Sequence, residues 1–86
     1  MSNFEVEFKK SALKELKKLP KQSGVRILKA IDKLSLNPRA GNVRGMVGVK
    51  SWRLKVGDYR VIYDINDQKL TILIIRVRHR KDVYRP

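Results

Sequence analysis

Residues 3–8 alternate between polar and apolar side chains. A period of two is typical of a half-buried β-strand, because successive side chains of a strand point to opposite faces. We therefore predict that the chain opens with a strand whose inward side chains are Phe4, Val6 and Phe8.

The apolar spacing changes to a helical one from Ser11. Apolar residues three and four positions apart share one face of a helix, and lysines occupy the other face here. The pattern predicts an amphipathic helix from Ser11 to Leu19, which Pro20 ends because proline has no backbone N–H. The apolar residues of this helix are Ala12, Leu13, Leu16 and Leu19.

A second helix is predicted over residues 21–36, and the sequence Asn37-Pro38 is expected to end it. Two helices joined this tightly predict an antiparallel helical hairpin. The buried stripe of the second helix is expected to hold Val25, Leu28, Ile31 and Leu34.

The second half of the chain is predicted to form strands. Residues 39–50 follow neither period and contain three glycines, so we expect a loop there. Segments rich in β-branched and aromatic residues follow at 51–56, 59–65 and 69–77, with turns at Gly57-Asp58 and Asn66-Asp67. The predicted fold class is α+β, in the order β-α-α-β-β-β, with a helical hairpin packed on one face of an antiparallel sheet.

Size and composition fit one folded domain over residues 1–86. A chain of 86 residues has room for a single core, and 42% hydrophobic residues argue against disorder. The chain contains no cysteine, which suits a reducing compartment. Its longest apolar run, residues 72–75, is far too short to span a membrane, and residues 1–8 lack the pattern of a signal peptide. We therefore expect a cytoplasmic protein.

The charge of the chain points to a polyanionic partner. Lysine and arginine total 21 against 8 acids, which gives a formal net charge of +13. On so short a chain this charge costs self-repulsion, so an anionic partner explains it better than solubility alone. Nucleic acid is the leading candidate.

The predicted turn at Gly57-Asp58 brings cations together. A two-residue turn places Lys55 opposite Arg60, and opposed residues share one face of a sheet. Arg53, Lys55 and Arg60 then emerge on one face within roughly 5–8 Å of one another. Opposed like charges destabilise a sheet, so a row of phosphates that neutralises them is one interpretation. An ordinary solvated basic face is the other, and the sequence leaves both open.

The last predicted strand and the basic tail over residues 79–86 add further polar side chains. Their position depends on the register of the turn at Asn66-Asp67, because a slip of one residue moves every side chain to the opposite face. The sequence does not fix that register. The residues concerned are Arg76, Arg78, His79, Arg80, Lys81, Tyr84 and Arg85.

The sequence lacks the residues that several kinds of catalytic site require. The glycines at 41–48 come without the lysine and serine or threonine of a nucleotide-binding loop, and the acids are scattered. With His79 as the only histidine, no metal site and no cofactor are predicted. RNA cleavage without metal stays open, because the 2′-hydroxyl of the substrate is the nucleophile and the protein supplies a base, an acid and cations. Lys55 is the best candidate for the base, since neighbouring guanidinium groups disfavour a charged ammonium, but a simple phosphate contact fits equally well.

The residues at 44–46, 52–63 and 77–84 resemble the RelE branch of the RelE/ParE toxin superfamily. The most specific segment is Gly-Asp-Tyr-Arg-Val-Ile-Tyr at 57–63, and the resemblance covers nearly the whole chain. It implies a RelE-like fold of the microbial ribonuclease type and the toxin of a type II toxin–antitoxin system. The implied activity is ribosome-dependent, metal-independent cleavage of mRNA in the decoding site, which inhibits translation. The implied partners are the ribosome, mRNA and a cognate antitoxin with an acidic or amphipathic segment, in a complex able to bind operator DNA.

The resemblance also implies roles for single residues. Lys55 matches the general base, and Arg53 stands where relatives often have a second lysine. Arg60 matches the arginine that stabilises the charge of the phosphorane, and Arg80 the residue at the leaving oxygen. Tyr84 matches the aromatic residue that orients the nucleophile or stacks on a base. The expected contacts to RNA phosphates are Arg53, Arg76, Arg78, His79 and Lys81.

The sequence departs from the family pattern at two points. An arginine at position 53 holds phosphate but stays protonated, so the base role falls on Lys55. The tail is short, so His79 and Arg80 can exchange places in the comparison, and His79 is either the acid or an ordinary surface residue.

Two other functions remain as alternatives. The ParE branch of the same superfamily shares the fold and inhibits DNA gyrase without being an enzyme, and the fold alone does not separate the two branches. A generic RNA-binding module is the second alternative. It is disfavoured because Trp52, Tyr59 and Tyr63 are predicted to face the core rather than to stack on bases.

Overall fold

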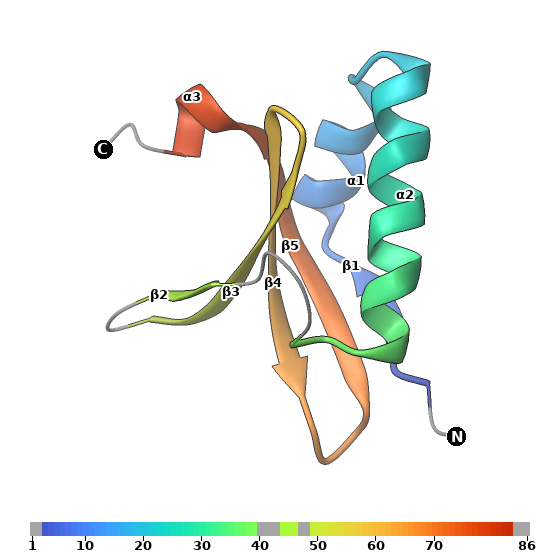
Figure 1. The fold of residues 1–86 in the computed structure, drawn as a ribbon, viewed down its shortest axis with the longest axis vertical. Helices are drawn as coiled ribbons and strands as arrows, with labels where there is room; N and C mark the ends of the chain where they lie inside the picture. The colour runs from blue at the N-terminus through green and yellow to red at the C-terminus, as the bar shows by residue number, and fades with distance from the viewer. Residues whose placement is uncertain (1–2, 40–43, 47–48, 84–86) are drawn as a thin grey trace.

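A computed structural model describes residues 3–39, 44–46 and 49–83 of the chain (Figure 1). The chain begins with strand β1 (Glu5–Phe8) and the helices α1 (Lys10–Lys17) and α2 (Lys21–Leu36). Four strands follow, β2 (Arg44–Met46), β3 (Val49–Val56), β4 (Tyr59–Asn66) and β5 (Thr71–His79), and then the short helix α3 (Arg80–Val83). The predicted bounds of the second helix match α2.

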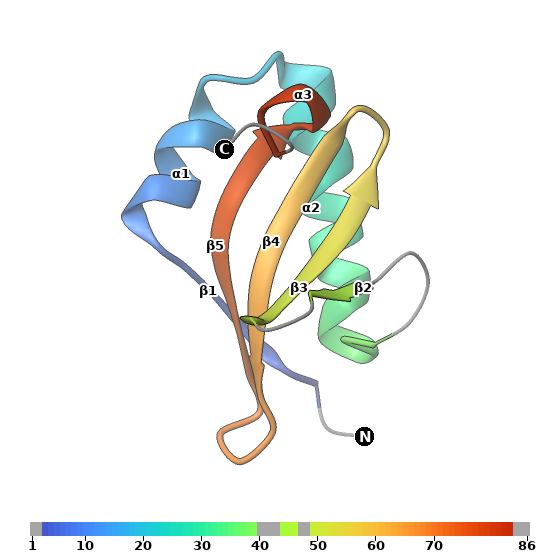
Figure 2. The same ribbon diagram turned by 90° about the vertical axis from the view of Figure 1, so that its left-hand side faces the viewer.

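The strands form one sheet in the order β1-β5-β4-β3-β2. Helix α2 lies along one face of this sheet, and α1 lies on the same side, beside β5 (Figures 1 and 2). The predicted α+β class, with a helical hairpin on one face of a sheet, is confirmed.

The fold differs from the prediction in one strand pairing and in several segments; for example, β3 begins at Val49, inside the predicted loop. Strands β1 and β5 pair in parallel, because the helical hairpin returns the chain before the β-meander begins and β5 then runs beside β1 in the same direction. Residues 44–46, expected in a loop, form β2 and pair with β3. Residues 80–83, expected in an irregular tail, form α3.

The core lies between α2 and the sheet. The helix buries Ile27, Ile31 and Leu34, which face buried residues of the sheet. The prediction that Val25 and Leu28 are buried is wrong, since they are 42% and 46% exposed. The spacing of 27, 31 and 34 turns a different stripe toward the sheet. The buried residues of the sheet are Leu54, Val61, Tyr63, Ile72, Ile74 and Val77.

Val25 and Leu28 line an apolar groove between α2 and β1 instead. Val6 and Phe8 of β1 form its other wall, and its volume is about 450 Å³. The apolar side chains that the pattern assigned to the core are therefore divided between the core and this groove.

Candidate functional site

The hairpin of β3 and β4 has the predicted register. Lys55 pairs with Arg60, and Leu54 pairs with Val61. Gly57 in the turn has a φ of +58°, a left-handed conformation that glycine adopts without steric cost. Leu54 and Val61 are buried under α2, so the cations emerge on the opposite side of the sheet. We call this side the outer face; it faces the viewer in Figure 2.

A β-bulge in β5 decides where Arg76 and Arg78 point. On β4, Ile62 and Tyr63 are neighbours, but their partners on β5 are Arg76 and Ile74, so one residue of β5 is left over. Before the bulge the even-numbered residue Ile74 is buried, and after it the odd-numbered Val77 is buried. The change of parity turns Arg76 and Arg78 onto the outer face, and a regular ladder would have turned them into the core.

The outer face therefore carries two rows of side chains across three strands. Lys55, Arg60 and Arg78 form one row. Arg53 and Arg76 flank Ile62 in the other row. Paired residues in adjacent strands have their Cβ atoms about 4.5–5.5 Å apart. We call the five cations, Arg53, Lys55, Arg60, Arg76 and Arg78, the outer-face cluster.

Two members of the cluster differ in how they are held. The side chain of Lys55 is exposed to solvent. Arg60 is half-buried, and its Nη1 donates to the backbone oxygens of Gly57 and Tyr59 at 3.0 and 2.9 Å. These contacts fix one corner of the guanidinium beside the turn, while Nε and Nη2 carry the N–H groups that an anion would use. The site thus combines a solvent-exposed lysine, Lys55, with a guanidinium, that of Arg60, which two hydrogen bonds hold in place.

Glu15 of α1 is the acidic residue that sequence reasoning missed. Its Oε1 accepts hydrogen bonds from Arg76 Nε at 3.2 Å and from the backbone N–H of Val77 at 3.0 Å. Its Oε2 accepts from Arg76 Nη2 at 3.1 Å and lies 3.9 Å from Arg78 Nε. In the sequence, Glu15 stands out only as the one acid among the lysines of the first predicted helix. Its role could not be predicted, because the sequence did not show that this helix lies beside β5.

Arg80 lies at the same end of the sheet as the β3–β4 turn. Its backbone N–H donates to the carbonyl of Asp58 at 2.7 Å, and its Nε is 3.8 Å from Asp58 Oδ1. Figures 1 and 2 show α3 beside this turn. These two contacts to Asp58 hold Arg80 at the end of the sheet that carries Lys55 and Arg60, a position that the sequence alone left open.

His79 does not join the outer-face cluster. It pairs with Tyr59, one position beyond the row of Arg60 and Arg78, and its ring meets the Tyr59 ring edge to face at 5.5 Å between centroids. Its Nδ1 accepts the backbone N–H of Lys81 at 3.2 Å. The side chain of Lys81 is exposed. Tyr84 and Arg85 lie outside the described residues.

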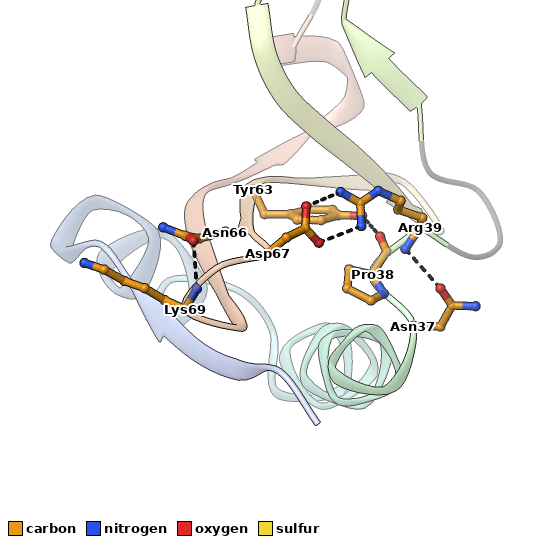
Figure 3. A network of polar contacts seen from close by, with 7 residues as sticks. All are labelled: Asn37, Pro38, Arg39, Tyr63, Asn66, Asp67 and Lys69. Atoms are coloured by element: carbon orange, nitrogen blue, oxygen red, sulfur yellow. Dashed lines mark hydrogen bonds and ion pairs between the residues drawn. The ribbon is translucent and has the colours of Figure 1, made fainter. Parts of the chain in front are cut away.

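A second polar network, also unpredicted, lies at the other end of the sheet (Figure 3). Arg39, just after α2, binds Asp67 of the β4–β5 turn through two hydrogen bonds of 3.0 and 2.7 Å. This pair raises the pKa of Arg39 and lowers that of Asp67. The Arg39 guanidinium also lies 5.6 Å from the centroid of the Trp52 ring. The network ties the segment after α2 to the sheet.

The buried end of that network is Tyr63. Its hydroxyl donates to the carbonyl of Pro38 at 2.7 Å, which satisfies a polar group inside the core. Burial raises the pKa of Tyr63 to about 12. Tyr63 therefore stabilises the fold and takes no part in the outer face.

The described residues also bear on two other kinds of site. No group of three or more His, Cys, Asp or Glu side chains comes together there in a way that could hold a metal ion. Within the same residues, no helix is both long and apolar enough to cross a membrane.

Comparison with known proteins identifies relatives over nearly the whole chain. A family model described as ParE toxin of type II toxin–antitoxin system, parDE, matches residues 6–84. The chain is 37% identical to toxin RelG of Mycobacterium tuberculosis, over 95% of this chain and 97% of that protein. It is 31% identical to the mRNA interferase toxin RelE of Escherichia coli K12, over 92% of this chain and 87% of that protein.

A solved structure has the same fold. It is the toxin–antitoxin complex RelBE2 from Mycobacterium tuberculosis, with a TM-score of 0.80 and 30% sequence identity. The match covers 92% of this chain and 93% of that one. The agreement extends from sequence to the arrangement of helices and strands.

Proposed function

Since the chain belongs to the ParE toxin family of type II toxin–antitoxin systems, as a RelE-like member, we propose that it is a ribosome-dependent endoribonuclease that cleaves mRNA. The observation that carries the proposal is the pairing of Lys55 with Arg60 on the exposed side of the β3–β4 hairpin, with Arg80 anchored to the same turn. These residues supply the groups that 2′-hydroxyl chemistry requires.

In the proposed reaction the 2′-oxygen of one nucleotide attacks the adjacent phosphorus. Lys55 is the general base that takes the proton of the 2′-hydroxyl. Arg60 stabilises the charge that develops on the phosphorane oxygens, because its guanidinium is already fixed beside the turn. The bond from phosphorus to the 5′-oxygen breaks, and Arg80 stabilises that leaving oxygen, which takes up a proton from water. The products are a 2′,3′-cyclic phosphate and a 5′-hydroxyl.

The other cations serve substrate binding in this proposal. Arg53, Arg76 and Arg78 lie on the same face and would contact the phosphates on either side of the scissile bond. His79 and Lys81 would contact RNA at the end of β5, and Tyr84 would orient the nucleophile or stack on a base. A ribosomal substrate places the activity in the cytoplasm.

The proposed regulatory partner is an antitoxin with an acidic or amphipathic segment. The RelBE2 structure contains a toxin with its antitoxin. A formal net charge of +13 on this chain favours an acidic partner segment that covers the outer face. The toxin–antitoxin complex would then bind operator DNA.

Inhibition of DNA gyrase is the second candidate, favoured by the ParE description of the matching family. The outer-face cluster weighs against it, because a protein that acts only by binding gyrase has no need for a lysine and a guanidinium paired at a tight turn.

One experiment separates the two candidates. The chain is induced in cells, the 5′ ends of mRNAs are mapped, and gyrase trapped on DNA is assayed in the same culture. We expect cuts phased with codons and no trapped gyrase. Trapped gyrase with intact mRNA would exclude the nuclease proposal.

A further inference from the structure

Helix α1 takes the place of a neighbouring strand beside β5 after Ile74. Strand β1 ends at Phe8, and its last partner on β5 is Ile74. Beyond this point, Ser11 Oγ of α1 donates to the carbonyl of Ile75 at 3.0 Å, and Glu15 accepts the N–H of Val77 at 3.0 Å. Residues four apart share a helix face, so one turn of α1 satisfies the edge of β5.

Glu15 does more than satisfy this edge. The N–H of Val77 uses only Oε1, whereas Oε2 is directed at the arginines, 3.1 Å from Arg76 Nη2 and 3.9 Å from Arg78 Nε. The Glu15 side chain is 24% exposed, against 60% for Asp67 in the chain's other bidentate pair among the described residues. A less exposed carboxylate is less screened and holds its partner more firmly.

The direction in which Glu15 pulls Arg76 and Arg78 affects the outer face. Arg78 stands in a row with Arg60 and Lys55, where like charges repel. Helix α1 lies beside β5 on the side away from β4 (Figure 2), and its residue Glu15 accepts the backbone N–H of Val77 on β5. Glu15 therefore draws the two arginines of β5 toward α1 and away from the space above Lys55 and Arg60.

We infer that Glu15 is a positioning residue for RNA cleavage: it orients Arg76 and Arg78 as one wall of the site and keeps the space above Lys55 and Arg60 open for the scissile phosphate. This inference rests on the proposed function. Arg76 keeps three N–H groups for a phosphate after its two bonds to Glu15.

Changing Glu15 to glutamine should affect RNA binding and cleavage in opposite ways. Removing a negative charge strengthens the attraction of the protein for any polyanion, so RNA binding does not weaken. Releasing the arginines disorders the wall of the site, so the chemical step slows. A merely structural role would lower stability and leave the rate of each folded molecule unchanged.

The experiment compares E15Q with D67N. Each variant removes one carboxylate charge from a bidentate pair with arginine, but Asp67 lies at the other end of the sheet. The glutamine oxygen can still accept the N–H of Val77, while its amide group replaces an acceptor with a donor. S11A, which removes the other side-chain contact to the edge of β5, is the control for stability.

Binding is measured with a labelled oligouridine, and cleavage with ribosomes that carry a defined mRNA, per folded molecule. We expect E15Q to bind RNA at least as tightly as the wild type and to cleave roughly tenfold more slowly at saturation. D67N and S11A should cleave within about twofold of the wild type. Equal cleavage by E15Q and D67N would overturn the inference.

Two further measurements test whether Glu15 acts through Arg76 and Arg78. They also separate a failure of this inference from a failure of the proposed function. When E15Q is added to R76A or to R78A, it should slow cleavage by less than it does in the wild type. The same slowing in both variants as in the wild type would contradict the inference. The Arg76 Nε–H resonance should be protected from exchange in the wild type and D67N and lost in E15Q; its persistence in E15Q would also contradict it. If the wild type cleaves no RNA, the proposed function fails, and the inference about the reaction fails with it, even where this resonance is protected.

Discussion

Replacing Arg60 with alanine tests the role proposed for this residue in RNA cleavage. The substitution removes a guanidinium that two backbone carbonyls hold beside the turn. A unit charge about 4 Å from a developing charge is worth about 4 kcal/mol in a partly screened site. Loss of one fixed donor of this kind slows enzymes by about 10²–10³-fold. We therefore expect R60A to slow cleavage by that factor.

The same substitution should leave the fold almost unchanged. The two hydrogen bonds of Nη1 contribute about 1 kcal/mol each. Against them stand the repulsions from Lys55 and Arg78 across the strands, at about 0.2–1 kcal/mol each. We expect the free energy of unfolding of R60A to lie within about 1 kcal/mol of the wild type.

The assay is single-turnover cleavage of mRNA on purified ribosomes, with urea denaturation of the same samples. R60K is the matched control, because it keeps the charge and loses the planar fork. It should cleave at a rate between those of the wild type and R60A. A folded R60A that cleaves within about threefold of the wild type would refute the role assigned to Arg60.

Three further predictions concern the fold. Tyr63→Phe leaves a buried carbonyl without its donor and should lower the free energy of unfolding by about 1–3 kcal/mol, measured by urea denaturation; no change would contradict the contact. Because the pair with Arg39 lowers the pKa of folded Asp67, its contribution to stability is present above the unfolded value near 3.8 and is lost as the pH falls through the lower folded value. Acid denaturation should show that loss in the wild type and not in D67N. Ile27→Ala should cost about 2–5 kcal/mol in thermal or urea unfolding and Leu28→Ala less than about 1 kcal/mol, whereas equal costs would contradict the observed face of α2.

The β3–β4 hairpin could be predicted from sequence because its information is local. A two-residue turn at Gly57-Asp58 fixes the register, and the register fixes which residues share a face. Lys55 and Arg60 could therefore be paired without coordinates. The class of the fold also followed from periodicity, since helical and strand patterns occupy separate parts of the chain.

The position of Arg76 and Arg78 could not be predicted, because it depends on a bulge. One unpaired residue in β5 reverses the parity of the side chains that follow, and no composition signal marks it. The role of Glu15 depends on how α1 docks beside β5, across 61 residues of chain. The buried face of α2 was mispredicted at Val25 and Leu28 because the apolar stripe of this helix is wider than the part that meets the sheet.

The most direct test of the central claim uses a ribosome-bound mRNA with a single 2′-deoxynucleotide at the cleaved position. If Lys55 and Arg60 act on a 2′-hydroxyl, the normal mRNA yields an upstream fragment that ends in a 2′,3′-cyclic phosphate, and the deoxy substrate stays intact at that position. Cleavage of the deoxy substrate at the wild-type rate would contradict the account.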